Sequence, residues 1–161
     1  MKVLDTLTDR LGDLVLSLHE FGALGQAAPD WELHAMVAPA AVPVVENDPH
    51  LARVWTWRDD LTAAETTGLG ADLRGAGFDA VVMLQYRRQL AMLLKKAGIA
   101  RRYGPWSKCD SWFLLNRGLR QNRSAGWRHE MEFYLQVGQR LLQDHGLAEV
   151  VDTPRAPSLH L

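Results

Sequence analysis

The chain has 161 residues, 47% of them hydrophobic, and a formal net charge of −1, so we expect one domain with one substantial core. Its apolar runs fall far short of the ~20 residues of a membrane-spanning helix, and no basic stretch followed by an apolar one opens the sequence, so we expect neither a spanning segment nor a secretion signal. The single cysteine, Cys109, excludes an internal disulfide and a cysteine-only metal site, and it fits a reducing cytoplasm.

The charge is divided unevenly along the chain. Residues 1–84 carry 13 acidic and 5 basic side chains, a net charge of −8. Residues 85–128 carry 11 Lys or Arg residues and one acid, Asp110, a net charge of +10, and residues 129–161 have a net charge of −3. Such a basic block predicts a surface that meets anions: phosphates, carboxylates, nucleic acid or an anionic membrane. The alternative is a solvated helix face with a few structural ion pairs.

The first predicted elements are a strand over residues 1–7 and a helix that follows it. The apolar side chains of this helix recur about every 3.6 residues, at Leu14, Val15, Leu18, Phe21 and Leu24. Gly12 and Asp13 fall in the connection. In an open α/β sheet this connection lies at the carboxyl ends of the strands, where ligands bind, and the first helical amides point into the crevice. Asp13 is therefore either an N-cap held by those amides or a general base.

Strand-like and helix-like segments alternate onward from residue 31. We expect a strand over residues 31–37, a short helix over 39–45, an edge strand over 53–57, a helix over 61–77, a buried strand over 78–84 and a helix over 88–97. We interpret Asp59 and Asp60 as caps of the helix over 61–77, in preference to a metal site. Gln85, Tyr86, Arg87 and Arg88 stand at the carboxyl end of the buried strand.

The second half of the chain repeats this alternation. We expect a strand over residues 99–103, a turn over 104–107, a brief helix over 110–115, an Arg-rich loop over 116–128 that covers the carboxyl edge of the sheet, and a helix over 129–143. The pattern predicts an α/β fold with a doubly wound, Rossmann-like parallel sheet over residues 1–150. Residues 151–161 are interpreted as the start of an interdomain linker.

Several catalytic motifs are absent from the sequence. It contains no Gly-x-Gly-x-x-Gly fingerprint, no phosphate-binding loop of the Gly-x-x-x-x-Gly-Lys type and no Gly-x-Ser-x-Gly elbow. His129 and Glu130 lack the second histidine that a zinc protease helix requires. The sequence therefore offers no standard dinucleotide, P-loop, serine-hydrolase or zinc-protease signature.

An ordered series of short segments resembles a known family. The segments are Arg-Leu-Gly-Asp-Leu-Val-Leu-Ser at residues 10–17, Ala-Pro-Asp at 28–30, Phe-Asp-Ala-Val-Val-Met-Leu-Gln at 78–85 and Arg-Arg-Tyr-Gly at 101–104, strengthened by residues 103–108, 116–121 and 129–130. In this order they resemble the amino-terminal half of the ADP-heptose:lipopolysaccharide heptosyltransferases, glycosyltransferase family 9. The resemblance extends over essentially the whole chain.

This resemblance implies an inverting, metal-independent enzyme of the GT-B type, whose first Rossmann-like domain binds the acceptor and whose second binds ADP-heptose. It implies that Asp13, next to Gly12, is the base that takes the proton of the acceptor hydroxyl, a step worth ~10²–10⁴-fold in rate. The acceptor would be an anionic, Kdo-bearing lipid A core at the cytoplasmic face of the inner membrane. Arginine pairs well with phosphate and carboxylate, so we expect acceptor contacts from Arg117, Arg120 and Arg123 first, and from Arg87 and Arg88 next.

Two departures qualify what the resemblance implies. Asp5 and Thr6 stand in a first strand that is usually aliphatic in the family, and the donor-binding half is not found in the sequence. We therefore expect no transfer by this chain alone, and a separate donor-domain chain is the partner that this predicts. Three functions remain open: an acceptor-binding half, a non-catalytic module for anionic glycans, and, ranked last, a nucleic-acid binder that uses the basic block with Trp106, Trp112 and Trp127.

Overall fold

The computed structural model describes residues 1–8, 18, 21–120 and 127–147, with only the backbone described for 127–131. The strands are β1 (Lys2–Leu7), β2 (Glu32–Val37), β3 (Leu51–Thr56), β4 (Ala80–Met83), β5 (Arg101–Pro105) and β6 (Arg117–Leu119). The helices are α2 (Val42–Val45), which follows the 3-10 turn η1 (Pro39–Ala41), α3 (Ala63–Ala76), α4 (Arg88–Lys96), α5 (Ser111–Leu114) and α6 (Trp127–Asp144). Residues 21–27 are also helical.

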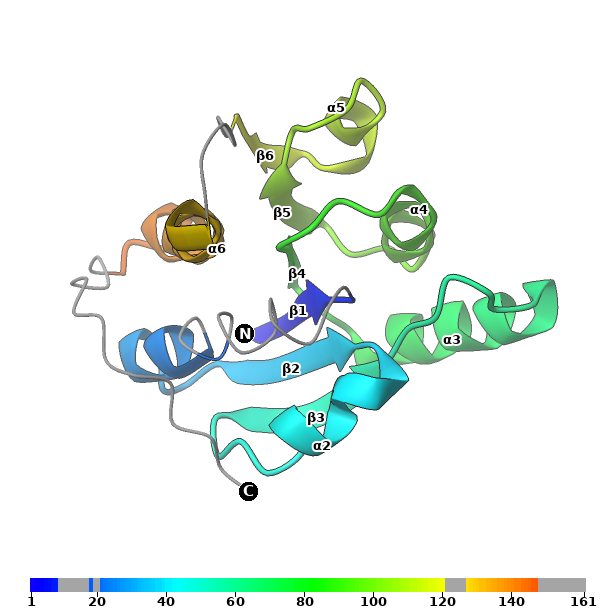
Figure 1. Cartoon of the computed structure of the whole chain (residues 1–161), viewed down its shortest axis with the longest axis horizontal. Helices are drawn as coiled ribbons and strands as arrows, with labels where there is room; N and C mark the ends of the chain where they lie inside the picture. Colours follow the sequence, from blue (N-terminus) through cyan, green and yellow to red (C-terminus); the bar gives the residue numbers. More distant parts are fainter. Residues whose placement is uncertain (9–17, 19–20, 121–126, 148–161) are drawn as a thin grey trace.

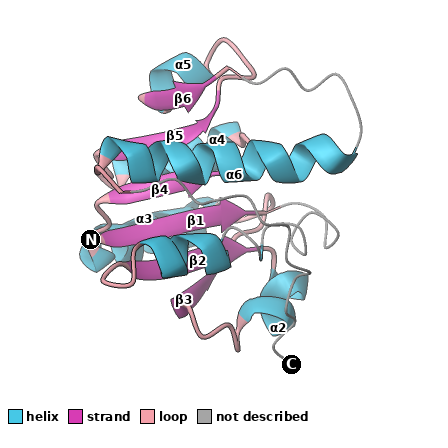
Figure 2. Ribbon diagram, turned by 90° about the vertical axis from the view of Figure 1, so that its left-hand side faces the viewer, coloured by secondary structure: helices cyan, strands magenta, loops and turns pink. Residues whose placement is uncertain are grey.

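The six strands form one parallel sheet in the order β3-β2-β1-β4-β5-β6. Helix α6 and the helical residues 21–27 lie on one side of the sheet, and α3 and α4 lie on the other (Figure 1). The turned view shows α6 running along the strands (Figure 2). This is the predicted doubly wound α/β fold, and its strand order reverses between β1 and β4.

The alternation of side chains along the strands builds a core on each side of the sheet. Val3 and Leu7 of β1 face the layer that contains α6, whereas Leu4 faces the layer of α3 and α4. Strand β4 is buried over its whole length, as its continuous apolar run predicts for a strand covered on both faces. Strand β3 lies at the edge and is largely exposed, which confirms its predicted position.

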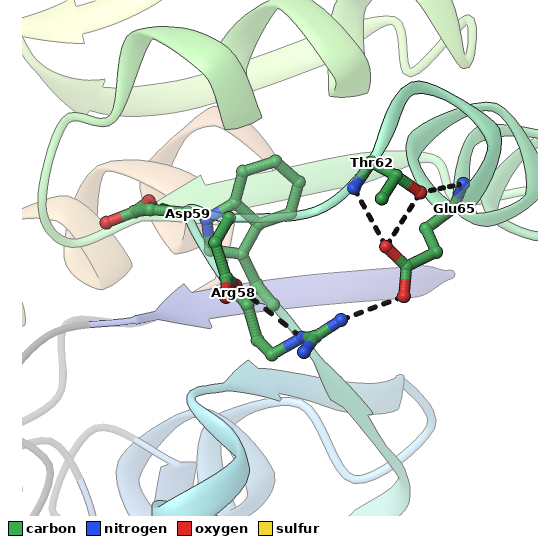
Figure 3. A network of polar contacts seen from close by, with 6 residues as sticks. Arg58, Asp59, Thr62 and Glu65 are labelled. Atoms are coloured by element: carbon green, nitrogen blue, oxygen red, sulfur yellow. Dashed lines mark hydrogen bonds and ion pairs between the residues drawn. The ribbon is translucent and has the colours of Figure 1, made fainter.

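Helix α3 begins at a capping box, which corrects one sequence-based prediction. Thr62 Oγ1 accepts a hydrogen bond from the Glu65 backbone amide at 3.2 Å, and Glu65 Oε2 accepts one from the Thr62 amide at 2.8 Å. Thr62, and not Asp59 or Asp60, is therefore the N-cap. In Figure 3, Arg58 reaches Glu65 while the Asp59 carboxylate points away from it. The hydrogen bonds from Thr62 hold the pKa of Glu65 below its ordinary value.

The segment after β5 departs most from the predicted pattern. Pro105 belongs to β5, although a turn was expected there, and Arg117–Leu119 form β6 where a loop was expected. The backbone explains the difference: Gly104 pairs with Gly118, and the Trp106 amide donates to the Leu119 carbonyl at 2.8 Å. A three-residue polar strand carries no hydrophobic alternation, so its pairing is invisible to pattern analysis.

Other predicted elements agree with the structure to within a few residues: the strands over 1–7, 31–37, 53–57, 78–84 and 99–103, and the helices over 39–45, 61–77, 88–97, 110–115 and 129–143. The start of the first helix, residues 121–126 of the expected Arg-rich loop and the expected linker lie outside the described residues. Within the described part of the chain, no helix is both long enough and apolar enough to cross a membrane.

Asp5 is a polar residue in the middle of the sheet. It stands between Val3 and Leu7 on β1, flanked in register by Ala35 of β2 and Val82 of β4, and its exposed fraction is 3%. Among the described residues neither of its carboxylate oxygens has a hydrogen-bond partner of good geometry, and the Thr6 backbone amide lowers its pKa less than burial raises it. Burial therefore raises the pKa of Asp5 well above the ordinary value of 3.8.

We expect Asp5→Val to raise the free energy of unfolding by about 1–3 kcal/mol at neutral pH, because an unpaired buried polar group costs about that much. The raised pKa also fixes the pH dependence. As the pH rises above 3.8, the unfolded chain ionises at Asp5 before the folded chain does, so wild-type stability falls toward neutral pH. Urea unfolding followed by circular dichroism across this pH range measures both effects.

The variant Asp5→Asn is the control, since it retains a buried polar group of the same shape but cannot titrate. It should lack the fall in stability with pH and remain less stable than Asp5→Val. A wild-type chain as stable as Asp5→Val at neutral pH would mean that the carboxyl group has a stabilising partner.

Candidate functional site

The strand order reverses between β1 and β4, and in open α/β folds ligands bind at the carboxyl ends of such a pair of strands. Strand β1 ends at Leu7, and the Leu84 amide, just past β4, still donates to the Thr6 carbonyl at 3.2 Å. Beyond this point the chain that leaves β4 passes through Gln85 into α4. Helices that start on opposite faces of the sheet diverge here, which is why ligands of open α/β folds bind at this position.

A polar hollow of about 440 Å³ opens beside the end of β4, and we call it the β4 hollow. It is lined by Asp59, Gln85, Tyr86, Arg87, Arg88, Gln89 and Lys108. The residues come from the loop after β3, from the β4–α4 connection and from the loop after β5. Three of the seven are cationic and one is anionic, so the hollow suits an anionic ligand.

Arg87 is held in place by Asp59. Its Nη1 lies 3.0 Å from Asp59 Oδ2, and Asp59 Oδ1 accepts a hydrogen bond from Trp57 Nε1 at 3.0 Å. The Arg87 side chain is 33% exposed. Asp59 therefore fixes the direction of this guanidinium, a role different from the helix cap predicted for it.

Asp110 pairs with Arg88, the second arginine of the β4 hollow. Its Oδ2 lies 3.4 Å from Arg88 Nε, and the Arg88 side chain is 71% exposed. Burial, together with the nearby Asp110 carboxylate, raises the pKa of Tyr86. Tyr86 thus keeps its proton at neutral pH and remains a potential hydrogen-bond donor.

A second hollow, of about 520 Å³, lies at the ends of β5 and β6, and we call it the tryptophan hollow. It is lined by Trp106, Ser107, Lys108, Cys109, Trp112, Phe113 and Arg120. Trp106 and Trp112 stack with ring centroids 4.8 Å apart and an interplanar angle of 22°, and the Arg120 guanidinium lies over the Trp112 ring at 5.4 Å. Lys108 lines both hollows, so they adjoin.

Two contacts fix the position of the Trp106 indole. Its Nε1 donates to the Leu115 carbonyl at 3.1 Å. A Cβ on Gly118 would overlap the Trp106 indole, so only glycine leaves room for the ring at that position of β6. The indole thus bridges the α5 segment and β6.

Arg117 lies apart from the other candidate arginines. It is level with Tyr103 in the middle of β5, and its Nη1 is 3.9 Å from Asp144 Oδ2 of α6. Tyr103 donates its hydroxyl to the same Asp144 oxygen at 2.9 Å, and burial followed by this carboxylate raises the pKa of Tyr103 to about 12. Burial opposes the ionisation of Asp144, but Tyr103 and Arg140 outweigh it and lower the Asp144 pKa. Here Arg117 helps to fasten α6 to the sheet.

Part of the basic block is structural. The half-buried Arg102 donates to the carbonyls of Ile99 and Leu114, each at 2.6 Å, and burial lowers its pKa. Lys95 donates to the Phe113 carbonyl at 3.2 Å. These two cations thus have structural partners in the backbone, and the Arg117–Asp144 contact is a structural ion pair of the kind that the sequence left open as an alternative.

The structure gathers some of the predicted site residues and not others. Arg87 and Arg88 line the β4 hollow, Arg120 lines the adjoining hollow, and Arg117 is directed to α6. Gly12, Asp13 and Arg123 lie outside the described residues. Sequence reasoning missed Lys108, which links the hollows; its position just after a predicted strand end was the available signal.

A metal centre is not part of what the structure shows: the described residues include no cluster of three or more His, Cys, Asp or Glu side chains that could hold an ion. What the arrangement offers chemically is a row of cations with a protonated phenol and exposed aromatic edges. Groups of these kinds are suited to binding and orienting an anionic ligand.

Comparison of the sequence with known proteins gives one curated relative. This relative is a Haemophilus influenzae protein whose name describes it as a glycosyltransferase by inference only. The two sequences are 25% identical over 153 residues, and the match covers 95% of this chain and 44% of the relative. No model of a known protein family matches the sequence. The chain thus spans less than half of the curated relative it matches.

Solved structures match over nearly the whole chain. The glycosyl transferase family 9 protein of Veillonella parvula has a TM-score of 0.77 and 18% identity, with 99% of this chain and 45% of that one covered. The ADP-heptose lipopolysaccharide heptosyltransferase II of Escherichia coli has a TM-score of 0.78 and 21% identity, with coverages of 100% and 47%. For E. coli heptosyltransferase WaaC, solved with ADP-2-deoxy-2-fluoro heptose, the TM-score is 0.73 and the identity 18%, with coverages of 97% and 51%.

All of these matches cover about half of the longer protein, and they agree with the ordered motifs and with the strand order of the sheet. The chain resembles the amino-terminal half of the family 9 heptosyltransferases, and it has the Rossmann-like fold of that half.

Proposed function

We propose that this chain is the acceptor-binding half of a heptosyltransferase-like, inverting glycosyltransferase of lipopolysaccharide core synthesis. The observation that carries the proposal is the row of cations at the carboxyl edge of the sheet, beside the β1–β4 switch point: Arg87, Arg88 and Lys108 in the β4 hollow and Arg120 next to it. In this fold, ligands bind at that edge. The heptosyltransferase likeness adds the class of ligand.

The proposed acceptor is an anionic, Kdo-bearing lipid A core. Carboxylates and phosphates of such a molecule pair with guanidinium and ammonium groups, and arginine adds two parallel hydrogen bonds. Asp59 fixes Arg87 before any ligand binds, so less side-chain entropy is lost on binding.

The proposed chemistry is proton removal by Asp13. As the acceptor hydroxyl oxygen attacks the anomeric carbon of the sugar, its proton passes to the Asp13 carboxylate, and ADP leaves with the electrons of the broken bond. The donor would be held by a second polypeptide half, either fused or supplied as a partner chain. We place the protein in the cytoplasm, at the inner face of the membrane, where such an acceptor is made.

Calorimetric titration of the chain tests the proposal directly. We expect a soluble Kdo-bearing core oligosaccharide to bind and ADP-heptose not to bind, because the chain covers 47% of heptosyltransferase II and the family resemblance assigns the donor to the other half. Binding of neither ligand would leave the fold likeness without its function. Binding of single-stranded oligonucleotide in place of the oligosaccharide would favour the nucleic-acid alternative.

The double variant Arg87→Gln/Arg88→Gln should weaken binding of the core oligosaccharide by about 10-fold or more, because each charge-assisted hydrogen bond is worth more than a neutral one. Calorimetry gives the Kd of wild type and variant. Arg101→Gln is the matched control, since Arg101 is an exposed arginine at the start of β5, at the opposite edge of the sheet. Equal losses in both variants would show nonspecific attraction, and no loss in the double variant would remove these arginines from the site.

The same titration distinguishes the roles of the predicted arginines that do not line the β4 hollow. We expect Arg120→Gln to weaken binding more than Arg117→Gln does, because Arg117 is engaged by Asp144 on the α6 face. Arg117→Gln should instead lower the thermal midpoint. Arg123 keeps its predicted role in acceptor binding, and Arg123→Gln belongs in the same series.

In a transferase reconstituted from this chain and a donor-binding half, Asp13→Asn should lower kcat by ~10²–10⁴-fold, the usual value of a general base. Acceptor binding and the circular dichroism spectrum should not change, because the change affects proton transfer alone. Asp9→Asn, in the same segment, is the matched control and should retain activity. Full activity of Asp13→Asn would reject Asp13 as the base, and a loss of folding would identify it as a helix cap.

A further inference from the structure

Three large hydrophobic side chains are exposed in the described part of the chain: Met92 by 39%, Trp112 by 49% and Phe113 by 79%. Trp112 and Phe113 are neighbours on the single turn of α5. Single exposed hydrophobic residues are ordinary, but an exposed tryptophan and phenylalanine side by side mark a contact surface. They also border the tryptophan hollow.

Met92 lies beside this turn. It is on the exposed stripe of α4 together with Arg88 and Lys95, which are four residues before it and three after it. Both of these neighbours contact the α5 segment, Arg88 through Asp110 at 3.4 Å and Lys95 through the Phe113 carbonyl at 3.2 Å. In Figure 1, α4 and α5 lie on the same side of the sheet. Met92 therefore extends the apolar area of α5.

Cations surround this apolar area. The aromatic–basic surface, as we call it, consists of Met92, Trp112 and Phe113 with the exposed cations Arg88, Lys95, Lys96, Lys108 and Arg120. Between residues 85 and 128 the sequence has one acid, Asp110, and it is paired with Arg88. The surface thus combines protruding apolar side chains with a strong excess of positive charge.

The tryptophan stack makes this surface rigid. Trp106 is fixed by the Leu115 carbonyl and by Gly118, and it covers one face of Trp112. With one ring face covered and Arg120 over the ring, Trp112 offers less open area to a stacked sugar or base. Phe113, the most exposed of the three, projects from a short turn without such cover.

From these observations we propose that the aromatic–basic surface docks the protein on an anionic lipid bilayer. Tryptophan and phenylalanine enter the boundary between headgroups and acyl chains, and lysine and arginine bind the anionic headgroups around them. Each cation near such a membrane adds to the attraction, which salt then screens. The docking surface shares Arg88, Lys108 and Arg120 with the proposed acceptor site, but docking needs neither the acceptor nor a transfer reaction, so vesicles that contain no acceptor test it separately.

Co-sedimentation of the chain with lipid vesicles tests the docking. We expect binding to vesicles of phosphatidylcholine with about one third phosphatidylglycerol, weaker binding at high salt, and little binding to phosphatidylcholine alone. Phe113→Asp should weaken binding by about 10-fold or more, because it removes an inserted ring and adds a negative charge. Lys96→Gln should weaken it by about 5-fold, a smaller loss that leaves the apolar side chains intact.

Ala64→Asp is the matched control, since it adds the same charge at an exposed position of α3, away from this surface. It should bind vesicles as wild type does, and all variants should keep the wild-type thermal midpoint. Wild-type binding by Phe113→Asp, or equal binding to both kinds of vesicle, would overturn the proposal.

Two further results would assign the surface to another occupant and overturn the proposal as well. One is a dimer in light scattering that Phe113→Asp converts to a monomer, with no vesicle binding by either. The other is a loss of oligonucleotide binding in Phe113→Asp while vesicle binding is absent throughout.

Discussion

The parallel pairing of β1 with β2 on one side and with β4 on the other determines where everything else in this molecule can lie. Because consecutive parallel strands need crossovers, the chain must leave β1 toward one face and β4 toward the other, and the two departures open a crevice at their carboxyl ends. Residues 85–88 lie at the carboxyl edge of the sheet because they directly follow the buried strand β4, which ends at Met83. The position of the cations is thus a consequence of topology, whereas their identity is a property of this sequence.

Ion pairs with aspartates restrict which of the arginines can bind a ligand. Asp59 holds Arg87, Asp110 holds Arg88, and Asp144 holds Arg117, but the exposed fractions of these side chains differ: 33%, 71% and 49%. An exposed pair gains little stability from its attraction, so a ligand that carries a phosphate or carboxylate competes for Arg88 at small cost. Arg117 has a different environment. Its partner Asp144, on α6, also accepts hydrogen bonds from Tyr103 of β5 and from Arg140 of α6, so Arg117 is part of the contact between α6 and the sheet.

Much of the fold follows from local chemistry that the sequence displays. The unbroken apolar run of β4, the amphipathic stripe of α4 and the positive φ of Gly98 after it are each encoded within a few residues. β6 is different, since Arg117–Leu119 gain strand geometry only by pairing with β5. The same holds for the site. That Arg87 and Arg88 lie at a strand end could be predicted, but the Asp59–Arg87 pair joins residues 28 positions apart. The Trp106–Trp112 stack joins residues close in sequence, but it depends on the path of the chain between β5 and α5, which no periodic pattern predicts.

The two proposed surfaces share Arg88, Lys108 and Arg120, and this constrains how they could act together. A bilayer against α5 would lie next to the tryptophan hollow, which adjoins the β4 hollow at that lysine. A glycan anchored in the same bilayer would then reach the cations of the β4 hollow by extending along the carboxyl edge of the sheet. A ligand in free solution gains nothing from this arrangement, whereas one confined to the membrane meets the site at a raised local concentration. The adjacency of an apolar, cationic surface and a polar, cationic hollow is therefore what a lipid-linked anionic acceptor requires.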